Sequence, residues 1–279
     1  MKSPTVRHRR LGRELRQLRE RAGLSVAETA RRLGWSASKA HRIEGGRIML
    51  SEADLVAACD LFGADSATRA SLVQLARDAG RRGWWTAYSD VFTGSYIALE
   101  AEATVIRKWE PLLIPGLLQS EDYAREIIRS GRPDLSASEV DRRVDARMTR
   151  KVRLLGASAP KLHALIDENA LRRLVGGPKV MARQLADILQ VVDWSNITIQ
   201  ILPIQADIAV GLEGAFSLMS FEEDPDVGYV EGPAGEVYVE AADQVRRFML
   251  TFERLADKAL SPKESAALIA AVRSNHDLS

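Results

Sequence analysis

The stretch AGLSVAETARRLGWSASKAHRIEGGR, residues 22–47, determines the fold of the N-terminal part of the chain. Ser25 and Ser36 each stand where a serine side chain can cap a helix. The stretch therefore predicts two short helices, the first ending at Gly34 and the second covering residues 37–44. Gly34 lets the chain turn sharply because it has no Cβ to clash. Two short helices joined by a Gly-containing turn form a helix-turn-helix, whose second helix fits the major groove of DNA.

Apolar residues at helical spacing predict three further helices around this pair. They cover about residues 9–22, 51–63 and 66–81. Ala30 is small enough for the two central helices to pack closely, and Ile43 anchors the second of them to the core. The opposite face of that second helix is then left free to contact a ligand.

Length and charge together indicate two domains with different partners. The chain has 279 residues, 46% of them apolar and 28% charged, so it is globular and long enough for two domains. Its net charge is +1, yet residues 1–82 hold 17 of the 39 Lys and Arg residues and 9 of the 38 Asp and Glu residues. A basic block on an otherwise acidic chain indicates a polyanion partner for that block. An Arg-rich, solvated helical surface is the alternative explanation.

Three features argue against a secreted or membrane protein. The single cysteine, Cys59, excludes an internal disulfide framework, and its apolar helix face predicts a core residue rather than a reactive thiol. The longest apolar stretch, near residues 112–118, contains Pro115 and falls short of the ~20 residues of a membrane span. The opening MKSPTVRHRR has no apolar run behind its charges, so no secretory signal is expected. We expect a cytoplasmic, nucleoid-associated protein without a membrane partner.

The remainder of the chain predicts a linker and a second domain. Residues 83–98 form an aromatic linker in which Trp84 and Trp85 are expected to pack against the protein, with a ligand platform as the alternative. Residues 99–279 predict an α+β domain with a mainly antiparallel sheet, whose later strands form a meander. The expected strands cover about residues 161–167, 197–202, 214–221, 227–231 and 236–240. The expected helices cover about residues 99–109, 120–129, 136–154, 170–174, 178–194, 242–259 and 262–274.

No residue pattern in the second domain predicts catalysis. Asp167 and Glu168 stand at a strand end, where paired carboxylates could hold a metal in a nuclease-like enzyme. The simpler interpretation is that they cap the helix that follows. The sequence contains none of the common hydrolase, metalloprotease, phosphate-loop or dinucleotide motifs. The histidines show no metal-ligand spacing among themselves: His8, His41, His163 and His276. We therefore expect no catalytic residue, no metal, no cofactor and no enzymatic activity.

The N-terminal motif resembles the Cro/lambda-repressor-type helix-turn-helix of the XRE family over about residues 8–65. The Gly-Leu-Ser opening, the Leu-Gly turn and the closing Arg-Ile-Glu-x-Gly all stand at the family spacing. The resemblance implies that the second helix of the motif is the recognition helix. Its base-reading residues would be Ala37, Ser38, His41 and Arg42, with a solvated position as an equal alternative for His41. Its phosphate-binding residues would be Ser25, Ser36, Lys39 and Arg47.

The same resemblance implies a structural ion pair between Arg19 and Glu44, because an inward charge needs a partner. A DNA contact is the alternative role for both residues. Two positions depart from the family pattern. Val26 stands where a glutamine often contacts the DNA backbone, and Thr29 stands where a core leucine is usual. Neither change removes the predicted fold, but Val26 removes one expected backbone contact.

The second domain resembles the C-terminal domain of WhiJ-like actinobacterial regulators over about residues 97–272. The runs that carry the resemblance are PGLLQSEDYA (115–124), LIDENALRRLVGGP (165–178), ITIQILP (197–203), YVEG (229–232) and SPKES (261–265). The resemblance implies a transcriptional regulator and a small BldB-like partner protein.

Two functions of different classes follow from these patterns. The first is a regulator that binds double-stranded operator DNA as a homodimer, while its C-terminal domain dimerises and receives a small-molecule or protein signal. The second is a sequestration module, in which binding of a protein partner is the main activity and DNA binding is secondary.

Overall fold

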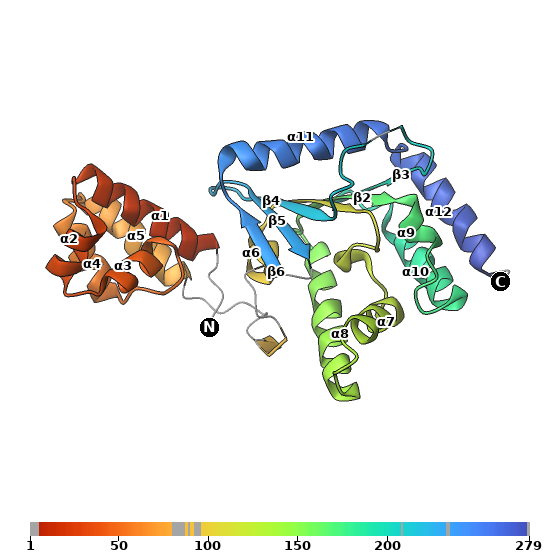
Figure 1. Cartoon of the computed structure of the whole chain (residues 1–279), viewed down its shortest axis with the longest axis horizontal. Coiled ribbons are helices and arrows are strands. Elements are labelled where there is room, and N and C mark those ends of the chain that lie inside the picture. Colours follow the sequence, from red (N-terminus) through yellow and green to blue (C-terminus); the bar gives the residue numbers. More distant parts are fainter. Residues whose placement is uncertain are drawn as a thin grey trace. The chain divides into compact units, whose positions relative to one another are not determined.

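A computed structural model of the chain describes residues 6–79, 87–88, 90–91, 96–207, 209–232 and 235–277. Trp84 and Trp85, the residues predicted to pack in an aromatic linker, lie outside the described residues. The chain divides into two compact units, Met1–Glu102 and Ala103–Ser279 (Figure 1). No helix of the described residues is both long enough and apolar enough to cross a membrane.

The N-terminal unit is helical. Its elements are α1 (Val6–Arg21), α2 (Val26–Leu33), α3 (Ala37–Glu44), α4 (Glu52–Leu61), α5 (Ser66–Ala79) and α6 (Tyr96–Glu102). Ser25, Ser36 and Ser51 cap α2, α3 and α4, because each side-chain oxygen accepts the backbone N–H three residues later at 3.1, 3.0 and 3.0 Å. The structure thus confirms the helix starts expected from these serines.

One hydrophobic core joins α1 to α3, α4 and α5. Its buried members include Leu11, Leu15, Ile43, Leu55 and Cys59. Cys59 is fully buried, and burial raises the pKa of its thiol, which keeps the thiol protonated and unreactive. The structure confirms that Cys59 is a core residue.

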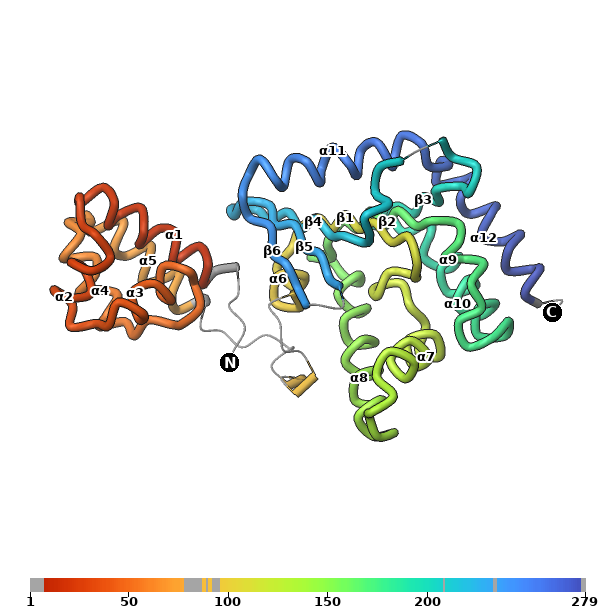
Figure 2. The backbone as a smooth tube through the Cα atoms, in the orientation of Figure 1, coloured from red at the N-terminus to blue at the C-terminus, as the bar shows by residue number. Residues whose placement is uncertain are grey.

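The C-terminal unit is built on a six-stranded sheet with the strand order β3-β2-β1-β4-β5-β6 (Figure 2). The strands are β1 (Val105–Glu110), β2 (Lys161–Asp167), β3 (Ile197–Leu202), β4 (Phe216–Ser220), β5 (Val227–Gly232) and β6 (Gly235–Val239). β1 pairs with β2 and β2 with β3 in parallel, whereas β1–β4, β4–β5 and β5–β6 are antiparallel. The sheet is therefore mixed, and the prediction of a mainly antiparallel sheet is wrong. The prediction that the later strands form a meander is confirmed.

The error has a specific cause, because β1 lies where a helix was predicted over residues 99–109. α6 ends at Glu102, and the chain then enters β1 at the centre of the sheet. β1 contains two consecutive basic residues, Arg107 and Lys108. In the sheet, Arg107 Nη1 donates to Ser220 Oγ at 3.3 Å, and Lys108 Nζ donates to Ser217 Oγ at 3.1 Å. β4 thus supplies a hydroxyl to each of the two basic side chains, and Lys108 also forms an ion pair with Glu110 of the same strand at 3.1 Å.

Helices cover the sheet and supply the long connections that parallel strands need. They are α7 (Glu121–Gly131), α8 (Ala137–Lys151), α9 (Glu168–Arg172), α10 (Pro178–Val191), α11 (Ala242–Lys258) and α12 (Pro262–Asp277), with short 3₁₀ turns η2 (Gly116–Leu118) and η3 (Val152–Leu154). α11 packs along one side of the sheet, where Phe248 meets Phe216 at 5.1 Å between ring centroids. Figure 1 shows α8 and α10 on the opposite side of the sheet.

Candidate nucleic-acid interface

The turn between α2 and α3 has the geometry that the sequence predicts. Gly34 adopts φ 66°, a left-handed conformation that favours glycine, and its N–H meets the carbonyl groups at the end of α2. The Trp35 N–H donates to the Ala30 carbonyl at 2.8 Å. Ala30 and Ala40 are both buried, so α2 and α3 approach each other closely through methyl groups. The turn therefore fixes α3 across α2 as a helix-turn-helix.

α3 has one buried and one exposed face. Ala40 and Ile43 are buried against the core. The four residues predicted to read bases are all exposed: Ala37, Ser38, His41 and Arg42. They recur at the spacing of a single helix face. Arg42 Nε donates to the Ser38 carbonyl at a long 3.4 Å. This is the sole hydrogen bond of the Arg42 side chain among the described residues.

The four residues predicted to bind phosphates differ in how the protein uses them. The oxygens of Ser25 and Ser36 accept the cap hydrogen bonds, which leaves each O–H as a donor for a phosphate. Arg47 is exposed, and its side chain meets no partner within the described part of the chain. Lys39, by contrast, forms an ion pair with Asp54, with 3.0 Å between Nζ and Oδ2.

Asp54 is a residue whose role sequence reasoning missed. Its other oxygen, Oδ1, accepts the indole N–H of Trp35 at 3.0 Å. The hydrogen bond from Lys39 is the main cause that lowers the pKa of Asp54, and the bonds from Trp35 and Ser51 act in the same direction. In the sequence, the helix cap at Ser51 already accounted for an acidic residue at position 54. Nothing therefore pointed to the contacts of Asp54 with Lys39 and Trp35, which lie 15 and 19 positions away.

Arg19 and Glu44 tie α1 to the end of α3. Arg19 Nε donates to Glu44 Oε1 at 2.5 Å, and Nη2 donates to Oε2 at 3.0 Å. A third bond runs from Arg19 Nη1 to the Leu24 carbonyl at 2.7 Å. The side chains are 9% and 13% exposed, so the fork-to-fork pair is shielded from solvent. The hydrogen bond to Glu44 is the first cause of the raised pKa of Arg19. The predicted structural ion pair is present.

The sequence patterns also did not predict that α1 passes close to α3 at Gly12. A Cβ at Gly12 would lie 2.6 Å from the carbonyl oxygens of both Ile43 and Glu44. On the other side of this contact, a Cβ at Gly46 would lie 2.7 Å from the Arg9 Cα, and Gly46 has φ 63°. The two glycines let α1 pass directly over the last turn of α3. A glycine inside an amphipathic helix was the available signal for this contact.

Thr29, which stands where a core leucine is usual in the XRE-type pattern, buries a polar group in the core. Its side chain is 1% exposed, and its hydroxyl has no hydrogen-bond partner among the described residues. A buried hydroxyl without a partner is destabilising by about 1–3 kcal/mol. Thr29 therefore keeps a core position at the expense of stability.

Thr29→Val removes this hydroxyl and keeps the shape of the side chain. We expect it to raise the free energy of unfolding of the N-terminal unit by about 1 kcal/mol. The change is measured by denaturant unfolding of the full chain. Thr68→Val is the control, because the Thr68 side chain is partly exposed in the first turn of α5, so its substitution removes no buried hydroxyl and should bring no comparable gain in stability. Equal effects of the two substitutions would show that the Thr29 hydroxyl has a partner.

In the C-terminal unit, the paired carboxylates have structural partners. Asp167 Oδ1 accepts the Asn169 N–H at 2.8 Å and so caps α9. Glu168 is buried, forms an ion pair with Arg172 at 2.5 Å and accepts the Ile204 N–H at 3.0 Å. The described residues contain no group of three or more His, Cys, Asp or Glu side chains arranged to hold a metal. These contacts support the capping interpretation over a metal site.

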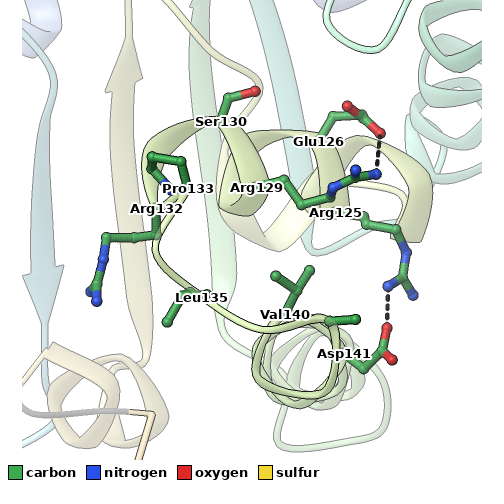
Figure 3. Close-up of a pocket in the computed structure, with 10 residues that line it drawn as sticks. Arg125, Glu126, Arg129, Ser130, Arg132, Pro133, Leu135, Val140 and Asp141 are labelled. Carbon is green, nitrogen blue, oxygen red and sulfur yellow. Dashed lines mark hydrogen bonds and ion pairs between the residues drawn. The ribbon is translucent and has the colours of Figure 1, made fainter.

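A hollow of about 660 Å³ lies between α7 and α8 (Figure 3). Arg125, Arg129 and Arg132 surround it, and Leu135 and Val140 contribute apolar surface. Each arginine has an acidic neighbour: Arg125 pairs with Asp141, Arg129 lies 3.8 Å from Glu126, and Arg132 is bound to Asp134 at 2.7 Å. The positive charges around the hollow are therefore largely balanced by neighbouring carboxylates of the protein.

Comparison with known families identifies both units. Residues 10–72 match the family described as a helix-turn-helix domain. Residues 93–271 match the family described as a domain of unknown function, DUF5753. The comparisons with curated proteins and with solved structures found no match.

Proposed function

We propose that this chain, which belongs to the DUF5753 family, is a transcriptional regulator that reads operator DNA through its N-terminal helix-turn-helix domain. The observation that carries the proposal is the division of α3 into a buried anchoring face and an exposed face bearing Arg42. A helix presented in this way fits the major groove, which is about 12 Å wide. The basic balance of residues 1–82 supports the same partner.

In this proposal the contacts fall into two classes. Arg42 reads a guanine, because its fork can donate to O6 and N7 together, and Ala37, Ser38 and His41 meet neighbouring base edges. Ser25, Ser36 and Arg47 hold phosphates and fix the register of the protein on the duplex. None of these residues performs a covalent step, and we propose that the protein is not an enzyme.

A dimer would supply the affinity that one small domain lacks. Two domains on half-sites one helical turn apart, about 34–36 Å, read twice as many bases as one. We propose that the C-terminal unit brings two chains together and receives the signal. That signal would be a small molecule or a BldB-like protein. The site of action would be the nucleoid.

Arg42→Ala and Arg47→Ala separate the two classes of contact. We expect Arg42→Ala to weaken binding to the preferred site by about 1–3 kcal/mol and to leave non-specific binding almost unchanged. Arg47→Ala should weaken binding to all sequences alike and lower the salt slope by about one. Both effects are measured by fluorescence anisotropy over a series of salt concentrations, on the site that the wild-type chain selects from random DNA. An equal loss on every sequence for Arg42→Ala would refute its role as a base reader.

A further inference from the structure

Three polar side chains from three separate elements meet beside the start of the recognition helix. Trp35 belongs to the α2–α3 turn, Lys39 to the first turn of α3, and Asp54 to the first turn of α4. The Asp54 carboxylate accepts one hydrogen bond from each of the other two, both at 3.0 Å. Lys39 Nζ also lies 4.9 Å from the centroid of the Trp35 ring, within the range of a cation–π contact. All three side chains therefore contact one another.

The carboxylate at the centre of this group is itself firmly held. The Asp54 N–H donates to Ser51 Oγ at 3.0 Å, which places the carboxylate at the N-terminus of α4. α4 is anchored in the core by the buried side chains of Leu55, Ala58 and Cys59. A negative charge in the first turn also interacts favourably with the helix dipole. Asp54 thus connects α3 to α4, a helix that is anchored in the core of the N-terminal unit.

The two groups that Asp54 holds flank the part of α3 that must meet DNA. Ser36, Ala37 and Ser38 lie between Trp35 and Lys39 in the sequence. Direct readout requires these residues to be placed precisely, because hydrogen bonds weaken steeply with misalignment. A carboxylate that fixes both ends of this segment fixes the entry of the helix into the groove.

The same ion pair changes the role expected of Lys39. With its ammonium 3.0 Å from the Asp54 carboxylate, the pair presents no net charge to an approaching phosphate. Binding a phosphate would require Lys39 to leave both Asp54 and the ring of Trp35. Arg47, which lacks a side-chain partner among the described residues, is under no such restraint.

We infer that Asp54 is a positioning residue for DNA recognition: its carboxylate clamps Trp35 and Lys39, and Lys39 acts in this clamp and not as a phosphate ligand. The inference rests on the proposed function, since it assigns roles within the same DNA-binding surface. It predicts an outcome opposite to that of simple electrostatics. Removing an acidic charge close to DNA should strengthen binding if charge alone mattered, whereas losing the clamp should weaken it.

The test compares Asp54→Asn with Glu52→Gln in the full chain. Glu52 is the matched control because it lies in the same first turn of α4 and also pairs with a basic residue, Arg77, at 2.8 Å. The first measurement is hydrogen exchange of peptides covering residues 35–44 without DNA. The second is affinity for the selected DNA site over a series of salt concentrations. For Asp54→Asn we expect hydrogen exchange to be about tenfold faster and DNA binding about tenfold weaker, with an unchanged salt slope. For Glu52→Gln we expect the exchange rates and the affinity of the wild-type chain.

Two results would overturn the inference. Exchange in Asp54→Asn equal to that in Glu52→Gln would show that no clamp exists. Tighter binding with a salt slope steeper by about one would show that Asp54 restrains a phosphate-binding Lys39 instead. If the wild-type chain selects no DNA site, the proposed function is refuted. The exchange rates would then still decide whether Asp54 holds the start of α3.

Discussion

Replacing Arg19 with methionine is expected to destabilise the N-terminal unit by about 3–5 kcal/mol, because it leaves the Glu44 carboxylate shielded from water without its partner. Four hydrogen bonds are lost together: two to Glu44, one to the Leu24 carbonyl at 2.7 Å, and a long one to Glu20 at 3.5 Å. Since Glu44 is the last residue of α3, the recognition helix should lose its attachment to α1, and DNA binding should fall with stability.

The loss of stability is measured by denaturant unfolding of the full chain. Hydrogen exchange of peptides from α1 and α3 assigns the loss to the N-terminal unit. Arg16→Met is the control, since Arg16 pairs with Glu20 at 2.8 Å on the same helix but the side chains are 62% and 50% exposed. We expect that control to change stability by less than about 1 kcal/mol. Combining Arg19→Met with Glu44→Leu should recover part of the loss, because no unpaired charge remains. Equal effects of Arg16→Met and Arg19→Met would contradict the role of the buried pair.

Gly12→Ala is expected to be the second most damaging change, with a net loss of about 2–3 kcal/mol. Alanine favours a helix over glycine by about 1 kcal/mol, so propensity alone predicts a gain. The new Cβ would however lie 2.6 Å from two carbonyl oxygens of α3 and 2.9 Å from the Gly46 nitrogen. These are backbone atoms, so no flexible side chain can move aside, and α1 must shift away from α3.

Gly131→Ala provides the matched control for this substitution. Gly131 is also a helical glycine, at the end of α7, and a Cβ there would meet nothing within 4 Å. We expect Gly131→Ala to be neutral or slightly stabilising in the same unfolding measurement. A stabilising effect at both positions would show that α1 and α3 are not in close contact at Gly12.

Local signals explain why much of the fold could be predicted. Serine caps fixed the starts of α2, α3 and α4, and the capping boxes at Ser136 and Ser261 marked α8 and α12. These signals act within one turn of helix, so the sequence contains them in full. The strands β2 and β3 were found with the correct ends because each is rich in apolar or β-branched residues that alternate with polar ones along part of its length.

The features that were missed depend on contacts between distant residues. β1 carries two consecutive basic residues, which a central strand accommodates through serine hydroxyls of β4 and through the ion pair of Lys108 with Glu110. The roles of Gly12 and Asp54 arise where α1 or α4 meets α3. The glycine inside an amphipathic helix was a local signal for the first contact, whereas no local pattern indicated the contacts of Asp54. The four residues of α3 to which the resemblance assigns base reading are exposed, and their contact with bases stays a prediction.

The most direct test of the account is selection of DNA by the purified full chain from a random-sequence pool, in parallel with its Arg42→Ala variant. The account predicts one enriched motif with two-fold symmetry and half-sites about one helical turn apart. It also predicts that Arg42→Ala loses its preference at one base pair in each half-site while the rest of the motif remains. Recovery of DNA without any motif would contradict the account and direct attention to protein partners of the C-terminal unit.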